Sequence, residues 1–282
     1  MKKIILLYFL LIFKITLSQT PKEHLKDFKI ITEMMDSVKK LQSIRFNMKS
    51  LERIETGYEE SHTQVKLQIN TRKVYLKNPA VKLELLYNAD NNKVKCLVKP
   101  NVFPYFTLSL DPRGNLMRKN QHFTIHEIGF DFTVKTIAIA LSKEKNQIAK
   151  HLSLLGKAEK NGMTCYLIIY ENQAFSYFDH IVGEKETAES ISHKYIVNEY
   201  MVRTKNKLFD NYGYLKKGTI VKIPNFYCKK GIFYIDEKSM LPVSITIFDE
   251  VGVFENYEYS NLEINKPIPA AEFERNFKGY SF

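Results

Sequence analysis

The sequence lacks the short motifs that mark the common classes of enzyme. It contains no Gly-x-Ser-x-Gly nucleophile elbow, no Walker phosphate loop and no glycine-rich dinucleotide fingerprint. It has only three cysteines and no Cys-x-x-Cys pair, which argues against a redox centre. These absences favour a binding protein over an enzyme, and we expect no cofactor and no metal ion.

The three cysteines are Cys96, Cys165 and Cys228. An odd number leaves at least one thiol unpaired in an oxidising compartment. Cys96 and Cys165 lie in strand-like runs and are expected in the core. Cys228 lies in a turn-like segment, so we expect it to be the exposed cysteine.

Long apolar runs are equally scarce. The stretch Ile4 to Phe13 follows Lys2-Lys3 and leads to small residues up to Ser18, which is typical of a signal peptide. It is too short to span a bilayer, and no later stretch of the mature chain is predicted to do so. No cysteine stands at the cleavage point, so we expect no lipid anchor there. We therefore expect residues 1–18 to direct export and the mature chain to be periplasmic.

The chain is basic, with 42 Lys and Arg residues, 31 Asp and Glu residues and a formal net charge of +11. This excess favours anionic partners such as lipid headgroups or cell-wall polymers. The alternative is solvated lysine on exposed strand faces. Because the basic residues are spread out and the chain is expected to be exported, nucleic acid is not an expected partner.

Apolar and polar residues alternate over most of the chain, which predicts one antiparallel sheet with a single buried face. A long strand is predicted from Ile44 into Glu60, and Phe233 to Tyr259 predicts three strands joined by two tight turns. Helices are predicted from Pro21 to Leu41 and from a cap at Asn120 or Thr124 to about Lys150. In the second helix, Gly129 and the segment Phe130-Asp131-Phe132 suggest a kink or an irregular first part. Further strand segments are expected at residues 65–70, 83–87, 94–98 and 152–170, and Phe273 and Phe277 are expected to anchor the tail in the core.

Two segments carry a resemblance to a known family. The C-terminal one reads strand, Asp, Leu-Pro, strand, Asp-x-x-Gly, aromatic strand, Asn-x-x-Ile-Pro, Glu-Phe, and it resembles the LolA/LolB-type lipoprotein-carrier superfamily. Together with the segment Leu108 to Phe132, it looks closer still to a family of secreted Bacteroidota proteins that has no established activity. The resemblance implies an α+β fold, a curved antiparallel half-barrel with helices in its concavity. In related carriers that shape binds acyl chains or hydrophobic peptide.

Residues 178–224 interrupt this pattern with the order strand, helix, helix, strand. The unit resembles a lysin motif (LysM), a small fold that binds N-acetylglucosamine-containing glycans, although Lys185 stands where the family usually has glycine. We therefore expect a half-barrel made of residues 19–177 and 225–282, with a LysM-like insert at 178–224. The resemblance implies a glycan groove between two loops, with these candidate residues: Gly183, Glu184, Glu186, Thr187, Asn211, Tyr212 and Tyr214.

A second group of candidates surrounds two histidines. On a helix, His122 and His126 would share a face and could chelate a metal, but no glutamate stands at the offset of the zinc-hydrolase patterns. The favoured alternative is that both histidines bond the turn at residues 111–120. Asp111, Arg113, Arg118 and Lys119 lie close by in sequence and form either an anion-binding surface patch or a solvated loop.

These observations favour a non-enzymatic periplasmic protein that binds a hydrophobic ligand, namely a lipid, a lipoprotein or a peptide, in its concavity. The insert would tether it to peptidoglycan. The first alternative is an envelope assembly factor that binds another protein through a sheet edge. The second is a metal-dependent hydrolase that uses His122 and His126.

Overall fold

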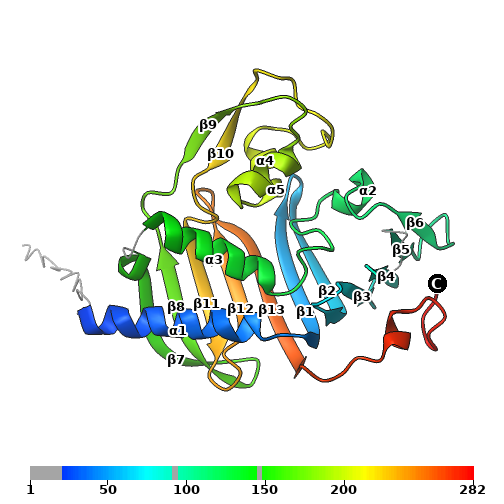
Figure 1. The fold of residues 1–282 in the computed structure, drawn as a ribbon, viewed down its shortest axis with the longest axis horizontal. Coiled ribbons are helices and arrows are strands. Elements are labelled where there is room, and N and C mark those ends of the chain that lie inside the picture. Colours follow the sequence, from blue (N-terminus) through cyan, green and yellow to red (C-terminus); the bar gives the residue numbers. More distant parts are fainter. Residues whose placement is uncertain (1–20, 91–94, 145–147) are drawn as a thin grey trace, which may run out of the picture.

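The computed structural model describes residues 21–282 except 91–94 and 145–147, so the predicted signal peptide lies outside the described residues. Its main feature is an open, curved antiparallel sheet of 11 strands, in the order β6-β5-β4-β3-β2-β1-β13-β12-β11-β8-β7. Helices α1 and α3 cross one face of this sheet (Figure 1). The predicted fold class, a curved antiparallel sheet covered by helices, is confirmed.

Most strands pair with their neighbours in sequence. The central pairing of β1 with β13 joins the N-terminal and C-terminal parts of the chain. The strands of the sheet are β1 (Ser43–Ile54), β2 (Gly57–Gln68), β3 (Lys73–Asn78), β4 (Leu83–Asn88), β5 (Cys96–Lys99), β6 (Leu108–Leu110), β7 (Leu152–Lys160), β8 (Met163–Glu171), β11 (Lys230–Asp236), β12 (Pro242–Phe248) and β13 (Val253–Ile264).

Helices α1 (Pro21–Lys39) and α3 (Asp131–Glu144) pack on the same face because each presents an apolar stripe to the sheet. Ile31, Met34 and Val38 of α1 are buried in the main core with Phe46 and other inward residues of the strands. The predicted N-terminal helix is therefore confirmed. Among the described residues, no helix is long and apolar enough to cross a membrane.

The C-terminal tail covers part of the opposite face. Phe273, in the 3-10 helix η2 (Ala270–Phe273), is fully buried against Tyr75 of β3 and Leu86 of β4, which project away from α1 and α3. Tyr280 stacks on Tyr75 with ring centroids 3.9 Å apart. Phe277 is only half-buried. The tail thus closes a second, smaller core, and the prediction that both phenylalanines enter the core holds for Phe273 alone.

The long strand predicted from Ile44 into Glu60 is wrong. The chain turns at Glu55-Thr56, and β1 and β2 form a hairpin in which Ile54 pairs with Gly57. Gly57 has φ +135°, a conformation that glycine adopts without penalty and that closes the two-residue turn. The alternating pattern continues through the turn, so it did not reveal the reversal.

The predicted caps of the second helix, Asn120 and Thr124, are also wrong, whereas the irregular first part expected near Gly129 is present. Residues 119–130 are irregular, and α3 begins at Asp131. Gly129 has φ +107°, and a Cβ there would lie 2.7 Å from Leu67 Cδ2. A right-handed helix cannot run through such a residue, so the helix starts after it. The described part of α3 runs to Glu144, and Ile148–His151 form a 3-10 helix.

The predictions for the three cysteines are right for two residues and wrong for the third. Cys96 and Cys165 are buried as expected, and burial raises the pKa of the Cys96 thiol to about 12 and that of Cys165 to about 11. Cys228, expected at the surface, is buried as well. It follows a loop that turns inward beneath α3, and burial raises the pKa of its thiol. All three cysteines are free.

Residues between β8 and β11 form a separate unit outside the large sheet. Strands β9 (Tyr177–Ile181) and β10 (Ile220–Pro224) pair with each other and enclose α4 (Ala188–Tyr195) and α5 (Glu199–Lys205). The unit has its own small core, which includes Val182, Ile191 and Ile223. Thr187 caps α4 and Asn198 caps α5, as their side-chain types predict. Lys185 has φ +52°, which fits a position where lysin motifs have glycine.

Candidate ligand-binding site

A cavity of about 320 Å³ lies between the sheet and α3. Strands β1, β2, β11, β12 and β13 form one wall, α3 forms the other, and the loops at 121–129 and 226–228 close the side. Most of the lining is apolar, with Met48, Phe132, Ile137, Phe233 and Ile245 as examples. The helix therefore covers the concavity without filling it.

Three glutamates stand next to one another on the cavity side of the sheet. In the strand register, Glu52 of β1 pairs with Glu59 of β2 on one side and with Glu255 of β13 on the other. All three line the cavity. Side chains of directly opposed residues lie about 5 Å apart at Cβ, and like charges at that separation destabilise a sheet. We call Glu59, Glu52 and Glu255 the glutamate row.

Glu52 occupies the middle of the row. Its carboxylate accepts a short hydrogen bond from the hydroxyl of Tyr257 and a bond of 3.3 Å from the backbone amide of His122. Burial raises the pKa of Glu52, and the charge of Glu255 raises it further, against the opposing effects of His122 and Tyr257. The row thus holds a carboxyl group that resists ionisation.

Glu255 is almost fully buried and has two partners. One oxygen lies 2.8 Å from His122 Nδ1, and the other accepts a bond of 2.8 Å from the hydroxyl of Tyr227. His122 Nε2 lies 3.0 Å from the carbonyl oxygen of Arg53. Both ring nitrogens of His122 therefore face acceptors, which suits the doubly protonated ring.

His122 does not lie on a helix, as the metal-binding alternative required. It lies in the irregular segment, with its ring stacked between Phe254 at 4.1 Å and Tyr200 at 4.7 Å. It bonds β13 and β1 and not the turn at residues 111–120, so the favoured structural alternative is wrong for this residue. The stacked rings and the two hydrogen bonds fix the imidazole at the edge of the glutamate row.

His126 is held separately. Its ring packs edge-on against Tyr87 at 5.2 Å and is half-buried. Because residues 122–126 are not helical, the two histidines do not form the shared helix face that a chelate needs. Among the described residues, no group of three or more His, Cys, Asp or Glu side chains is placed to hold a metal ion.

The two histidines are expected to titrate on opposite sides of the ordinary histidine value of 6.5. Burial alone would lower the pKa of His122, but the bond to Glu255 and the charges of Glu52 and Glu255 raise it. Burial lowers the pKa of His126, and Arg113 and Arg72 add to this effect. The contribution of His122 to stability is thus present below pH 6.5 and is lost as the pH rises through its folded pKa, whereas that of His126 is lost as the pH falls below 6.5.

Imidazole ¹⁵N–¹H correlation spectra recorded over a pH series measure both midpoints, and His126→Gln assigns the second signal. A midpoint for His122 below the ordinary value, or one for His126 above it, would contradict this description of the site.

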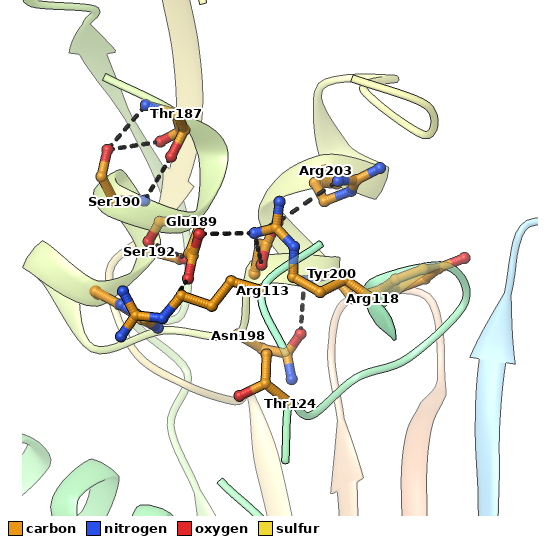
Figure 2. Close-up of polar contacts among 12 residues, drawn as sticks. Arg113, Arg118, Thr124, Thr187, Glu189, Ser190, Ser192, Asn198, Tyr200 and Arg203 are labelled. Atoms are coloured by element: carbon orange, nitrogen blue, oxygen red, sulfur yellow. Dashed lines mark hydrogen bonds and ion pairs between the residues drawn. The ribbon is translucent and has the colours of Figure 1, made fainter. Parts of the chain in front are cut away.

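The predicted surface patch is an internal contact. Arg118 is buried, and its Nη1 lies 2.9 Å from Glu189 of α4 and 3.2 Å from Glu199 of α5. Arg113 Nε lies 3.6 Å from Glu189, and Lys119 lies 3.9 Å from Asp210. Figure 2 shows the two arginines reaching the carboxylate of Glu189.

The basic side chains of residues 111–119 therefore bind the unit at 177–224 and do not form a free anion site. Asp111 accepts a bond of 2.9 Å from the amide of Arg113 and shapes the turn. The two predicted alternatives were an anion-binding patch and a solvated loop, and neither describes Arg118, which is buried. The partners of these basic side chains are carboxylates of the same chain.

The two loops predicted to form a glycan groove are adjacent. The amide of Leu215 donates to the carbonyl of Glu186 at 2.8 Å, and Lys217 pairs with Glu184 at 2.5 Å. Two of the candidates serve local structure. The carboxylate of Glu186 accepts bonds of 2.7 Å from the amide of Gly183 and from His180, while Thr187 caps α4.

The two candidate tyrosines differ in their surroundings. The guanidinium of Arg203 lies 3.6 Å from the ring centroid of Tyr212, and that of Arg118 lies 5.0 Å away. The Tyr212 ring is therefore already in contact with two arginines of the same chain. Tyr214 is 69% exposed, and Asn211 beside it is exposed as well. Of the two rings, Tyr214 is the one available to a ligand.

The glutamate row was missed in the sequence, although a signal for it is present. Phe46 and Met48 mark the inward side of β1, and the same two-residue period leads to Ser50 and Glu52. Glu255 stands in phase with Tyr257 and Tyr259 of β13 in the same way. A carboxylate at an inward position of a half-buried strand signals a polar site within the core.

Comparison with known protein families assigns the chain to one of them. The family described as "Protein of unknown function (DUF1571)" matches residues 14–178, which is more than half of the chain. The chain belongs to the DUF1571 family. In this DUF1571 protein the matched region includes Leu108 to Phe132 and ends in β9, so strands β10 to β13 lie outside it. No curated protein matches the sequence significantly.

Several solved structures resemble this DUF1571 protein at low sequence identity. The Pseudomonas aeruginosa MucA/MucB complex is 9% identical over 88% of this chain and 60% of the other, with a TM-score of 0.40. The lipoprotein LppX of Mycobacterium tuberculosis is 12% identical over 89% and 99%, with a TM-score of 0.39. A LolA superfamily protein of Nitrosomonas europaea is 10% identical over 88% and 97%, with a TM-score of 0.32. The DUF1571 protein spans about six tenths of the length of MucB.

Proposed function

We propose that this DUF1571 protein is a non-enzymatic binding protein of the cell envelope that holds a hydrophobic ligand in the cavity beneath α3. The ligand class comprises lipids, the acyl groups of lipoproteins and apolar peptides. The cavity of about 320 Å³ between α3 and the sheet is the observation that carries the proposal. Location in the envelope rests on the signal peptide predicted at residues 1–18.

The chemistry of the walls supports an apolar ligand. Sites for small ligands commonly measure about 300–1,000 Å³ and are lined mainly by apolar side chains with a few polar groups, and this cavity has both properties. Each 100 Å² of apolar ligand surface removed from water contributes about 2.5 kcal/mol. An acyl chain or an apolar side chain placed between Met48 and Ile137 would gain from this effect.

Native mass spectrometry of the protein purified from the organism that naturally produces it tests the proposal. We expect adducts that disappear after extraction with organic solvent, and uptake of the neutral fluorophore N-phenyl-1-naphthylamine by the extracted protein. A protein that carries no adduct and takes up no fluorophore before or after extraction would refute the proposal.

A second candidate function concerns the unit at 177–224, and the exposed ring of Tyr214 favours it. We infer that this unit tethers the protein to peptidoglycan, with Tyr214 stacking on a sugar face between loops 183–187 and 211–215. The neighbouring amides and Asn211 would bond the acetamido group. The unit has a separate core, which would let it bind glycan without disturbing the cavity.

Substitution of Tyr214 and of Tyr212 distinguishes a glycan-binding role from a structural one. Tyr214→Ala is expected to weaken retention on purified peptidoglycan roughly fivefold, equivalent to about 1 kcal/mol of lost aromatic contact. Tyr212→Ala, which removes the ring beside Arg203 and Arg118, is expected to lower thermal stability instead. Equal retention of wild type and Tyr214→Ala in a sedimentation assay would rule out a stacking role for Tyr214.

A further inference from the structure

The glutamate row gives the cavity a charge opposite to that of the whole chain. The chain has a net charge of +11, yet none of the described residues that line the cavity is lysine, arginine or histidine. Five lining residues are acidic: Glu52, Glu59, Glu60, Glu127 and Glu255. Two of them have basic partners outside the lining, because Lys49 Nζ lies 3.2 Å from Glu60 and His193 Nε2 lies 3.6 Å from Glu127. The charge of the cavity therefore depends mainly on the glutamate row.

The row is only partly neutralised by its surroundings. His122 donates its backbone amide to Glu52 and bonds Glu255 through its ring. The hydroxyl of Tyr257 donates to Glu52, and that of Tyr227 donates to Glu255. Glu59 is exposed at the cavity edge, and within the described part of the chain its carboxylate makes no hydrogen bond or ion pair. It stands directly opposite Glu52 in the sheet. The row therefore retains unsatisfied acceptor capacity and unrelieved repulsion on the side that faces the cavity.

A hydroxyl group that lines the cavity also lacks a hydrogen-bond partner. Thr63 is 8% exposed, lines the cavity, and its hydroxyl has no hydrogen-bond partner. It stands on β2 in phase with Ser61 and Glu59, so a polar track runs along this strand to the glutamate row. Burial of an unpaired hydroxyl costs stability, and a ligand group that bonds it recovers that cost.

We propose that the cavity selects amphiphiles with a protonated amine: the apolar part lies beneath α3 and the ammonium group binds Glu59 and Glu52. This inference rests on the proposed function and names the ligand class of the same site. An ammonium group has three donors and a positive charge, so it satisfies the free acceptors and relieves the repulsion within the row. A carboxylate or phosphate head group would instead add a negative charge to the acidic row, which disfavours its binding.

Three probes with the same hydrocarbon chain test the selectivity. Dodecylamine, dodecanol and dodecanoate, each below its micellar concentration, compete with N-phenyl-1-naphthylamine for the extracted protein near neutral pH. We expect dodecylamine to bind at least about tenfold more tightly than dodecanoate, with dodecanol between them. Equal or tighter binding of dodecanoate would overturn this inference and leave the proposed function intact. Failure of all three probes and of the fluorophore would overturn both.

Single substitutions assign the selectivity to the row. Glu59→Gln is expected to reduce the ratio of the two affinities severalfold while leaving dodecanol unchanged, and because Glu59 is exposed the variant should fold. Glu55→Gln, an exposed change in the adjacent turn that does not line the cavity, is the matched control and should keep the wild-type ratio. An unchanged ratio in Glu59→Gln, or an equal loss in Glu55→Gln, would show that the general charge of the protein sets the preference, and would refute the assignment.

Discussion

Arg118→Met is expected to lower the free energy of unfolding by about 3–5 kcal/mol, because it leaves two carboxylates without their main counter-charge in a largely buried interface. The side chains of Glu189 and Glu199 are only 16% and 15% exposed. Burial already raises the pKa of Glu199 despite the attraction of Arg118 and Arg203. Loss of Arg118 therefore forces these carboxylates either to remain charged with little solvation or to take up protons on folding.

Chemical denaturation at two pH values measures this loss. We expect a smaller destabilisation at low pH, where both carboxylates are protonated in the folded and unfolded states. Arg113→Met, which removes an exposed arginine that lies 3.6 Å from the same Glu189, is the matched control and is expected to cost less than about 1 kcal/mol. The triple variant Arg118→Met/Glu189→Gln/Glu199→Gln should recover most of the stability. Equal costs for the two arginine variants would contradict the assignment of Arg118 as the main counter-charge of Glu189 and Glu199.

Ala140→Trp is expected to weaken binding of N-phenyl-1-naphthylamine by at least about tenfold, which corresponds to about 1.4 kcal/mol. Ala140 lies on the cavity side of α3, and an indole at this position would occupy space within the cavity of about 320 Å³. Overpacking of a closed core costs stability, whereas filling an existing cavity costs little. The variant should therefore lose binding while keeping a thermal transition close to that of the wild type.

Ala138→Trp provides the matched control, because Ala138 is exposed on the same helix. Fluorophore titration and thermal melts on both variants separate occlusion from misfolding. Wild-type affinity in a folded Ala140→Trp variant would show that the ligand binds elsewhere.

Much of the fold could be predicted because its local signals agree with the final packing. The strands β11 to β13 alternate cleanly and are separated by turns at Asp236 to Ser239 and Asp249 to Gly252, and Gly252 takes the positive φ that such a turn favours. The caps at Thr187 and Asn198 likewise mark the starts of α4 and α5. Where periodicity, turn chemistry and capping all point the same way, sequence is a sufficient guide.

The errors have long-range causes. Gly129 indicated an irregular segment, but the start of α3 at Asp131 depends on the fit of Gly129 against Leu67 of β2, a contact across 62 positions. Cys228 is buried because its loop turns beneath α3, which again depends on a distant helix. The turn at Glu55-Thr56 has charged and polar neighbours that resemble the exposed side of a continuing strand.

The candidate site was predicted only as a concavity. The glutamate row is created by the pairing of β13 with β1 and of β1 with β2, which brings Glu255 beside Glu52, about 200 positions earlier in the chain. Its parts were visible as charges at inward positions, but their assembly required the strand order. Of the residues predicted from their chemistry, His122 holds the row and Arg118 joins the unit at 177–224 to the main fold.

A crystal structure of the extracted protein with dodecylamine tests the central claim most directly. The account predicts hydrocarbon density between α3 and strands β1, β12 and β13, with the nitrogen within hydrogen-bond distance of Glu59 or Glu52. Density for the amine at another surface, with α3 closed onto the sheet and the space beneath it empty of ligand, would contradict it.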